Sequence, residues 1–233
     1  MNIKNELNFF KEQSLWKGGY FEGDPLNPNA ISSYDEMGLG KIDEAGLGKI
    51  SVLHATYLHC IKPYIKNSIA LEIGPGRGGW TRCLLPAKEV WCLDAYSAEY
   101  NKFFEYVGKQ SHVQYHVVED FSFSKLPEKH FNYVFSFGCL CHISFEGIYE
   151  YAKNMYNKLI TGANCFWMVA DYKKYNTAVK KPVLDLNQPD DLVPGRWFNT
   201  YDRVIKALSD LNYTIVATDV GTCLRDPIIH FRK

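Results

Sequence analysis

A glycine-rich turn between an apolar run and a helical pattern is the first place where residue types and spacing indicate chemistry. It lies in ALEIGPGRGGWT, residues 70–81, where Gly74, Gly76 and Gly79 satisfy the spacing G-x-G-x-x-G. Asp94 follows the first glycine by 20 residues and ends the next apolar run, where a carboxylate can bind a ribose diol. On this spacing alone, the chain would be an NAD(P)-dependent oxidoreductase.

The same glycines also satisfy a second spacing. Glu72, Gly74, Gly76 and Gly78 read E-x-G-x-G-x-G, which resembles motif I of the class I S-adenosylmethionine-dependent methyltransferases. Such a turn passes close to its ligand, so glycines provide clearance for the backbone. An acidic residue inside the first strand is costly to bury unless it is paired. The methyltransferase family characteristically has an acidic residue there, as at Glu72.

Later segments extend the resemblance over roughly residues 50–233. VVEDFSF places Asp120 at the end of the third strand, where the family has an acidic residue that accepts from the adenine amino group; Glu119 is the alternative by one position. The closing pair YTIVATDV and RDPIIHFRK resembles the family's antiparallel final strands. The chain departs from the family in LITGAN, residues 159–164, which lacks the usual proline before the fifth strand.

This resemblance implies a Rossmann-like α/β fold: a mainly parallel seven-stranded sheet with helices on both faces and an antiparallel final strand. It implies the cofactor S-adenosyl-L-methionine, with S-adenosyl-L-homocysteine as product, and is nearest to bacterial O-methyltransferases that act on small molecules and sugars. The oxidoreductase and a non-catalytic S-adenosylmethionine-binding module remain the alternatives. The residues expected around the cofactor are Glu72, Gly74, Pro75, Gly76, Gly78, Trp80, Asp94, Ala95, Asp120, Phe121 and Phe137.

Two further segments are candidates for the chemistry at the methyl acceptor. FSFGCLCHIS, residues 135–144, looks like the family segment that ends in a histidine before a helix. Methyl transfer is an in-line displacement at an activated carbon, so the protein mainly aligns the acceptor and removes a hydroxyl proton. His142 suits that second task because the unperturbed pKa of histidine lies near neutrality; its alternative is a capping or core histidine. Asp171, after the fifth strand, is a candidate second base, metal ligand or helix-start carboxylate.

A polar insertion, residues 173–199, follows Asp171 and has the character of a substrate loop. Arg196 in this loop could clamp an anionic acceptor, or it could make a surface ion pair. The residues expected to bind the acceptor are Tyr172, Arg196 and Trp197.

The elements that must position these residues alternate from residue 69 onward, which predicts right-handed crossovers and a mainly parallel sheet. The best helical pattern spaces Phe145, Ile148 and Ala152 along one apolar stripe. The predicted helices cover residues 52–66, 79–86, 97–108, 145–160 and 200–211, and the predicted strands cover 69–74, 89–94, 113–119, 132–138, 164–170, 213–219 and 225–232.

Residues 1–50 are expected to form an N-terminal cap or lid segment before a methyltransferase domain of residues 51–233. The first part is rich in aromatic residues and turn formers, and Trp16, Tyr20 and Trp80 are candidates to close over the cofactor. DEMGLGKI is followed directly by DEAGLGKI at residues 35–50. Two octapeptides are too short for a solenoid, so the repeat favours a duplicated surface loop over a functional lid.

Composition excludes several classes of function. The 26 basic residues balance the 26 acidic ones, which disfavours a nucleic-acid partner. The 7 cysteines indicate free thiols of a reducing compartment, and Cys139, Cys141 and His142 lack the second half of a zinc site, so no metal is expected. With neither a signal peptide nor an 18-residue apolar stretch, the chain is expected to be cytoplasmic, a monomer or homodimer, and to act on a small-molecule acceptor away from membranes.

Overall fold

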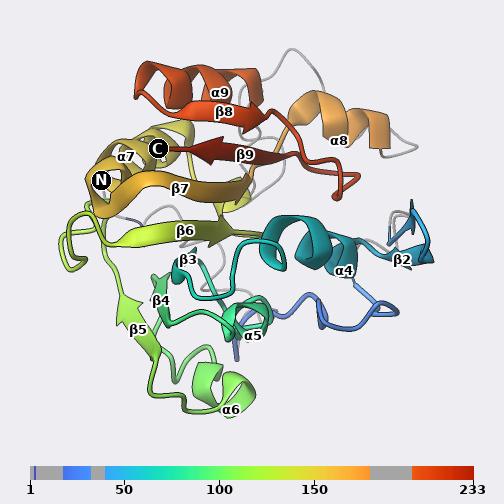
Figure 1. The fold of residues 1–233 in the computed structure, drawn as a ribbon, viewed down its shortest axis with the longest axis horizontal. Coiled ribbons are helices and arrows are strands. Elements are labelled where there is room, and N and C mark those ends of the chain that lie inside the picture. Colours follow the sequence, from blue (N-terminus) through green and yellow to red (C-terminus); the bar gives the residue numbers. More distant parts are fainter. Residues whose placement is uncertain (1–2, 4–17, 33–39, 179–200) are drawn as a thin grey trace.

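A seven-stranded sheet forms the centre of the computed structural model, which describes residues 3, 18–32, 40–178 and 201–233 (Figure 1). The strand order is β5-β4-β3-β6-β7-β9-β8. The five strands from β5 to β7 are parallel, and β9 is antiparallel to both of its neighbours. The strands are β3 (Ile69–Ile73), β4 (Glu89–Asp94), β5 (Val113–Val117), β6 (Phe131–Ser136), β7 (Leu159–Met168), β8 (Thr214–Ala217) and β9 (Ile228–Arg232). The fold class predicted from the sequence is therefore confirmed.

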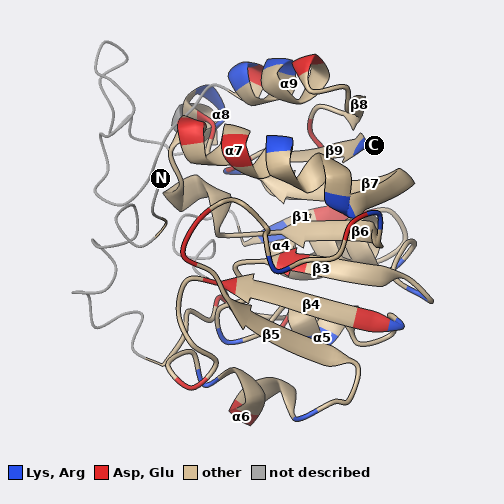
Figure 2. Cartoon of the chain, turned by 90° about the vertical axis from the view of Figure 1, so that its left-hand side faces the viewer, with Lys and Arg blue, Asp and Glu red and all other residues tan. Residues whose placement is uncertain are grey.

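Helices cover both faces of this sheet, because its central strands are apolar on both sides. One layer of the core contains α4 (Val52–Thr56), the π-helical turn η2 (Tyr57–Ile61), α5 (Thr81–Leu84) and α6 (Phe103–Val107). The other contains α7 (Phe145–Met155) and α9 (Tyr201–Asp210). Figure 2 shows that the positions of charged residues lie mostly on the helices and at strand ends, while the middle of the sheet is mostly uncharged.

Several helices are shorter than the apolar periodicity predicts. Helix 97–108 is reduced to α6 because Lys102, directly before it, has a left-handed φ of 51°. Helix 79–86 is reduced to α5 because the glycine turn continues to Trp80. Helix 145–160 ends at Met155 and tightens into a 3₁₀ turn, η4 (Tyr156–Lys158). β7 then begins at Leu159, which pairs with Phe131 of β6, so LITGAN lies inside a strand.

The described part of the duplicated octapeptide, which was predicted to be a surface loop, forms a hairpin of β1 (Lys41–Glu44) and β2 (Gly48–Ser51). The isoleucines that end the two copies pair with each other, since Ile42 lies opposite Ile50, whereas Lys49 lies opposite Asp43. Ile50 is buried, whereas Leu47 at the tip is 57% exposed. The hairpin follows from alternation: the two isoleucines share one face, and the exposed Asp43 and Lys49 lie on the other.

The order of the strands determines where a ligand can bind. The chain runs from β3 outward to β5, then returns to place β6 on the other side of β3. In open α/β sheets, the crevice lies at such a reversal, outside the carboxyl ends of the strands.

Within the described residues, no helix is long and apolar enough to cross a membrane. All 7 cysteines are free thiols.

Candidate functional site

A cavity of about 860 Å³, measured to include its open mouth, lies at this reversal. Its walls come from the ends of β3, β4 and β6, from residues 20–23 of the N-terminal segment, and from α7. Of the residues expected around the cofactor, the cavity is lined by Gly74, Pro75, Gly76, Trp80, Asp94, Ala95 and Phe137. Seven of the eleven residues that the sequence assigns to the cofactor therefore line one cavity, and their contact with a cofactor stays a prediction.

The glycines of the turn are required by close approaches within the protein. A Cβ at Gly74, where φ is 75°, would lie 2.4 Å from both Cβ and Sγ of Cys139, which follows β6. A Cβ at Gly76 would lie 3.0 Å from the carbonyl oxygen of Tyr20. Gly78 is turned away from the cavity, against Val107 and Phe103 of α6. Its place in the motif therefore reflects packing of the turn onto a helix, and it is not among the residues that line the cavity.

Asp94, at the end of β4, joins the glycine turn to the cavity wall. Its Oδ2 accepts the backbone N–H of Gly76 at 3.1 Å, and its Oδ1 accepts that of Tyr96 at 2.9 Å. Burial raises the pKa of Asp94 to about 6, although these two N–H groups act in the opposite direction. Backbone N–H groups that follow β3 and β4 thus hold both oxygens of this carboxylate in place at the cavity.

Glu72, predicted to bind the cofactor, lies behind the turn and is 2% exposed. Its Oε2 accepts the hydroxyl of Thr81 at 2.6 Å and the thiol of Cys92 at 3.6 Å. Burial raises the pKa of Glu72 to about 7, and the Thr81 hydrogen bond partly offsets this. Glu72 therefore connects β3 to α5 and β4, and supports the turn without lining the cavity.

Asp120 and Phe121 lie beside the main cavity. Asp120 is exposed, and a hydrogen bond from Ser122 lowers its pKa. It lines a neighbouring cavity that shares Leu93 with the first. Phe121 is buried, and its ring lies 4.7 Å from that of Tyr151, which does line the main cavity. Phe121 therefore supports the wall from behind.

His142 lines the cavity at the end of the 3₁₀ turn η3 (Leu140–His142), where its backbone N–H donates to the carbonyl of Cys139 at 2.9 Å. Trp80 and Phe137 line the same cavity, with ring centroids 4.5 Å apart. His142 therefore reaches the cavity after β6, and its role at the acceptor stays a prediction. The described residues contain no group of three or more metal-binding side chains.

Asp171, the candidate second base, is 1% exposed and fastens two helices. Its Oδ1 accepts the N–H of Lys174 in the first turn of α8 (Tyr172–Ala178) at 2.6 Å, and its Oδ2 accepts that of Tyr201, the first residue of α9, at 2.9 Å. This is the helix-start alternative, since both oxygens cap backbone groups. Tyr172 is packed against the core, and Arg196 and Trp197 lie outside the described residues.

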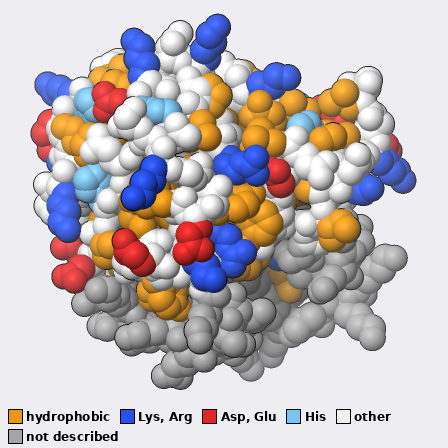
Figure 3. Space-filling view, turned by 90° about the horizontal axis from the view of Figure 1, so that it is seen from below, with side chains coloured by type: hydrophobic (Ala, Val, Ile, Leu, Met, Phe, Trp, Pro, Cys, Tyr) orange, Lys and Arg blue, Asp and Glu red, His pale blue; other side chains and the backbone are white. Residues whose placement is uncertain are grey.

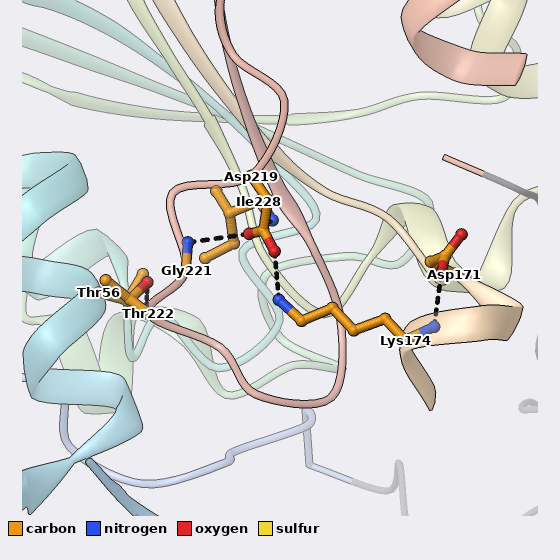
Figure 4. A network of polar contacts seen from close by, with 7 residues as sticks. All are labelled: Thr56, Asp171, Lys174, Asp219, Gly221, Thr222 and Ile228. Carbon is orange, nitrogen blue, oxygen red and sulfur yellow. Dashed lines mark hydrogen bonds and ion pairs between the residues drawn. The ribbon is translucent and has the colours of Figure 1, made fainter. Parts of the chain in front are cut away.

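Lys174 extends this network to the connection between β8 and β9 (Figure 4). Its ammonium pairs with Asp219, whose other oxygen accepts the N–H groups of Gly221 at 2.9 Å and Ile228 at 3.1 Å. Thr222 in the same connection shares a 2.9 Å hydrogen bond with Thr56 of α4. The carboxyl ends of β7 and β8 are thereby tied to α8 and α4.

Sequence reasoning missed most of the site residues supplied by the N-terminal segment. Residues 18–24, which we call the strap, cross over the glycine turn. Arg77 donates its backbone N–H to Tyr20 O at 3.2 Å and its side-chain Nε–H to Gly18 O at 2.8 Å. Tyr20 was a candidate as a closing aromatic, but Glu22 had no signal, because a contact across more than fifty residues leaves no periodic pattern.

Other lining residues were also missed, for the same reason. They have no motif spacing of their own and reach the cavity only through the fold. They are Ile3, Phe21, Gly23, Tyr96, Asn101, Cys139, Ile143 and Tyr151.

The face seen in Figure 3 shows lysine and arginine side chains interspersed with acidic, histidine and hydrophobic ones. A duplex-binding surface instead gathers basic side chains along one face. The described part of this face therefore has no continuous basic stripe.

No family model matches the chain, and no curated protein matches it. Solved structures do share its fold. An S-adenosylmethionine-dependent methyltransferase from Mesorhizobium loti has a TM-score of 0.59 at 17% identity, over 77% of this chain and 98% of that one. Mitomycin 7-O-methyltransferase has a TM-score of 0.56 at 12% identity, over 78% of this chain and 53% of that one.

A third structure differs in its acceptor atom. Phosphoethanolamine N-methyltransferase 1 from Haemonchus contortus, in complex with phosphoethanolamine and S-adenosylhomocysteine, has a TM-score of 0.55 at 18% identity, over 76% of this chain and 41% of that one. Identities this low show a shared fold and leave the acceptor open.

Proposed function

We propose that this chain is an S-adenosylmethionine-dependent methyltransferase that transfers a methyl group to a hydroxyl of a small polar acceptor, such as a sugar or a nucleotide-activated precursor of a surface glycan. The observation that carries the cofactor assignment is the hydrogen bond from Gly76 N–H to Asp94 Oδ2, at 3.1 Å. It puts a carboxylate on the amide that a dinucleotide site would direct at a phosphate.

This contact argues against the oxidoreductase. The dinucleotide fingerprint works because free backbone N–H groups and a helix N-terminus attract a diphosphate. Here one of those N–H groups is bonded to an anion, and the following helix α5 has only 4 residues. Within the described lining, the acidic and basic side chains are Glu22 and Asp94, apart from His142. An acidic cavity suits a cationic sulfonium compound better than a diphosphate.

The lining residues match the parts of S-adenosylmethionine. Asp94 is suited to the ribose diol, and the aromatic and aliphatic wall of Tyr96, Ile143 and Tyr151 to the adenine. The turn residues Gly74 and Gly76 provide room for the methionine part. When bound, the cofactor supplies a methyl group on a positively charged sulfur, which leaves as a neutral thioether. The protein then has to exclude water, orient the acceptor and accept its proton.

His142 is the residue that we assign to the acceptor proton. It lines the cavity after β6, as Trp80 and Phe137 do, and an imidazole can accept a proton near neutral pH. We assign Asp171 to the architecture of the acceptor side, because both of its oxygens are bonded to backbone N–H groups. The strap over the turn supports a role of residues 1–50 as a cap. We further propose a cytoplasmic enzyme, monomer or homodimer, that acts on a soluble acceptor.

Ligand-induced stabilisation of the purified protein tests this proposal. A ligand at about one hundred times its dissociation constant stabilises a protein by about 2.7 kcal/mol. We expect S-adenosylmethionine and S-adenosylhomocysteine to raise the melting temperature, and NAD(H) and NADP(H) to leave it unchanged. A shift with the dinucleotides alone would overturn the proposal. Transfer of labelled methyl groups to a pool of sugars and nucleotide sugars then separates an enzyme from a non-catalytic binding module.

A further inference from the structure

Within the described cavity lining, the second acidic side chain comes from outside the methyltransferase-like domain. Glu22 lies on the strap, and its Oε2 is 3.8 Å from the position that a Cβ of Gly138 would occupy. Gly138 follows β6, so this carboxylate lies at the same edge of the sheet as Asp94, on the other side of β3. Because Gly138 has no side chain, Glu22 reaches the wall of the cavity directly.

The strap holds Glu22 in this position through contacts that lie outside the cavity. Arg82 of α5 donates to Asp24 at 3.1 Å, and Arg77 binds the carbonyls of Gly18 and Tyr20. The hydroxyl of Tyr20 donates to Glu22 Oε1 at 3.4 Å. Glu22 is therefore presented by a segment that is fastened on both sides of it.

The separation of the two carboxylates matches a cofactor with two polar ends. Asp94 ends β4 and Gly138 follows β6, and β3 lies between these strands. Two strand spacings amount to roughly 10 Å, which is comparable to the distance from the ribose diol to the α-ammonium group in extended S-adenosylmethionine. With Asp94 at the ribose, Glu22 stands at the methionine end of a cavity that Gly74 and Gly76 also line.

We propose that Glu22 binds the α-ammonium group of the methionine moiety, so that the strap completes the cofactor site. This inference rests on the proposed function. A carboxylate is the natural partner of an ammonium group, and a hydrogen bond between charged groups in a sheltered cavity is stronger than one between neutral groups. Cofactor recognition then depends on a segment that precedes the sheet by about fifty residues.

Three ligands separate the parts of the cofactor: S-adenosylmethionine, S-adenosylhomocysteine, which lacks the sulfonium, and 5′-methylthioadenosine, which lacks the amino-acid group. Calorimetric titration of Glu22→Gln should show about tenfold to one-hundredfold weaker binding of the first two, the range expected for loss of a charged hydrogen bond. Affinity for 5′-methylthioadenosine should remain unchanged. Glu105→Gln is the matched control, since it removes an exposed carboxylate of α6 that neither lines the cavity nor fastens the strap, and it should change all three affinities by less than about twofold.

The other outcomes overturn the inference. A loss confined to S-adenosylmethionine would place Glu22 at the sulfonium; equal losses for all three ligands would indicate a collapsed cavity; no loss would remove Glu22 from the cofactor site. The same selective loss in Glu105→Gln would mean that the effect is one of negative charge in general. If the wild-type protein binds none of the three ligands, the proposed function fails, whatever Glu22 does.

Discussion

The two sides of the sheet's carboxyl edge use aspartates in different ways. On the side of β3, β4 and β6, Asp94 accepts two backbone N–H groups and still lines the cavity. On the side of β7, β9 and β8, Asp171 and Asp219 also accept two backbone N–H groups each, but they fasten helices and a loop (Figure 4). The first side encloses the cavity. The second side is a hydrogen-bonded junction of α8, α9 and the connection between β8 and β9, which we call the staple.

The difference comes from the neighbouring strands. At the reversal of strand order, β3 and β6 send their chains to opposite faces, so a carboxylate at the next strand end faces a crevice. Beyond β7, β8 brings the chain to the same edge and the antiparallel β9 begins there, so the connection between β8 and β9 lies at the carboxyl end of β7. The same residue type therefore lines a cavity on one side and caps helices on the other.

We expect the largest effect from adding a methyl group at the glycine turn, which tests how tightly the cavity side is packed. In Gly74→Ala, the new Cβ would lie 2.4 Å from Cys139, with φ at 75°. Overpacking and backbone strain together should cost about 4 kcal/mol of unfolding free energy, measured by urea denaturation. Gly162→Ala is the matched control, because its φ is 81° and no heavy atom lies within 4 Å of its Cβ position. Strain alone should cost that variant about 1 kcal/mol.

If Gly74→Ala and Gly162→Ala cost the same, the close approach of β6 to the turn is absent. The cavity side would then be no more tightly built than an exposed bend in β7.

The second test removes the charge behind the turn. The folded pKa of Glu72 is raised from 4.5 to about 7, so the folded state holds a proton more tightly than the unfolded state. Its contribution to stability is present at low pH and is lost as pH rises through about 7. In Glu72→Gln this loss is removed, so the variant should gain about 3 kcal/mol relative to wild type between about pH 4 and about pH 9.

Denaturation curves of both proteins across this pH range measure that difference. The pKa of Asp94 is raised in the same direction, but Asp94 is present in both proteins and cancels in the comparison. Parallel stability profiles would show that Glu72 is ionised in the folded protein at neutral pH, and that the turn rests on a charge.

The third test compares chemistry with architecture on the cavity side. His142→Ala should lower kcat about one-hundredfold, the usual effect of losing a general base. Binding of S-adenosylhomocysteine should change little, because the base acts on the acceptor. Unchanged turnover in a labelled-methyl assay, once an acceptor is known, would make His142 a wall residue.

The sequence predicted the cavity side well because its signals are local. The apolar run ALEI, the glycines directly after it and Asp94 at the end of the next strand lie close together in the sequence. The structure brings them together as well. Glu72 shows the limit of such signals. An acidic residue within a strand indicates a special environment, but the structure was needed to show that Thr81 and Cys92 face it.

The contacts of the strap and of the staple could not be predicted from local sequence signals. Tyr20 and Glu22 reach the cavity through main-chain contacts with Arg77, which have no sequence periodicity. Asp171 and Asp94 both follow strands, and their difference depends on strand order rather than on neighbouring residues. Helix 97–108 is shorter than predicted because Lys102 adopts a left-handed conformation. A lysine in the sequence does not indicate that conformation.

The smallest expected effect, that of changing Asp171, gives the clearest distinction between the cavity side and the staple side. Asp171→Ala removes the acceptor of two backbone N–H groups, so it should cost about 1–2 kcal/mol of unfolding free energy, as other lost helix caps do. Affinity for S-adenosylhomocysteine should stay the same, because Asp171 is not among the cavity-lining residues. Asp171→Asn retains one acceptor oxygen and should recover part of the stability. If Asp171→Asn is as stable as wild type yet loses turnover at saturating cofactor, the charge of Asp171 serves the reaction, and the staple side shares in the chemistry after all.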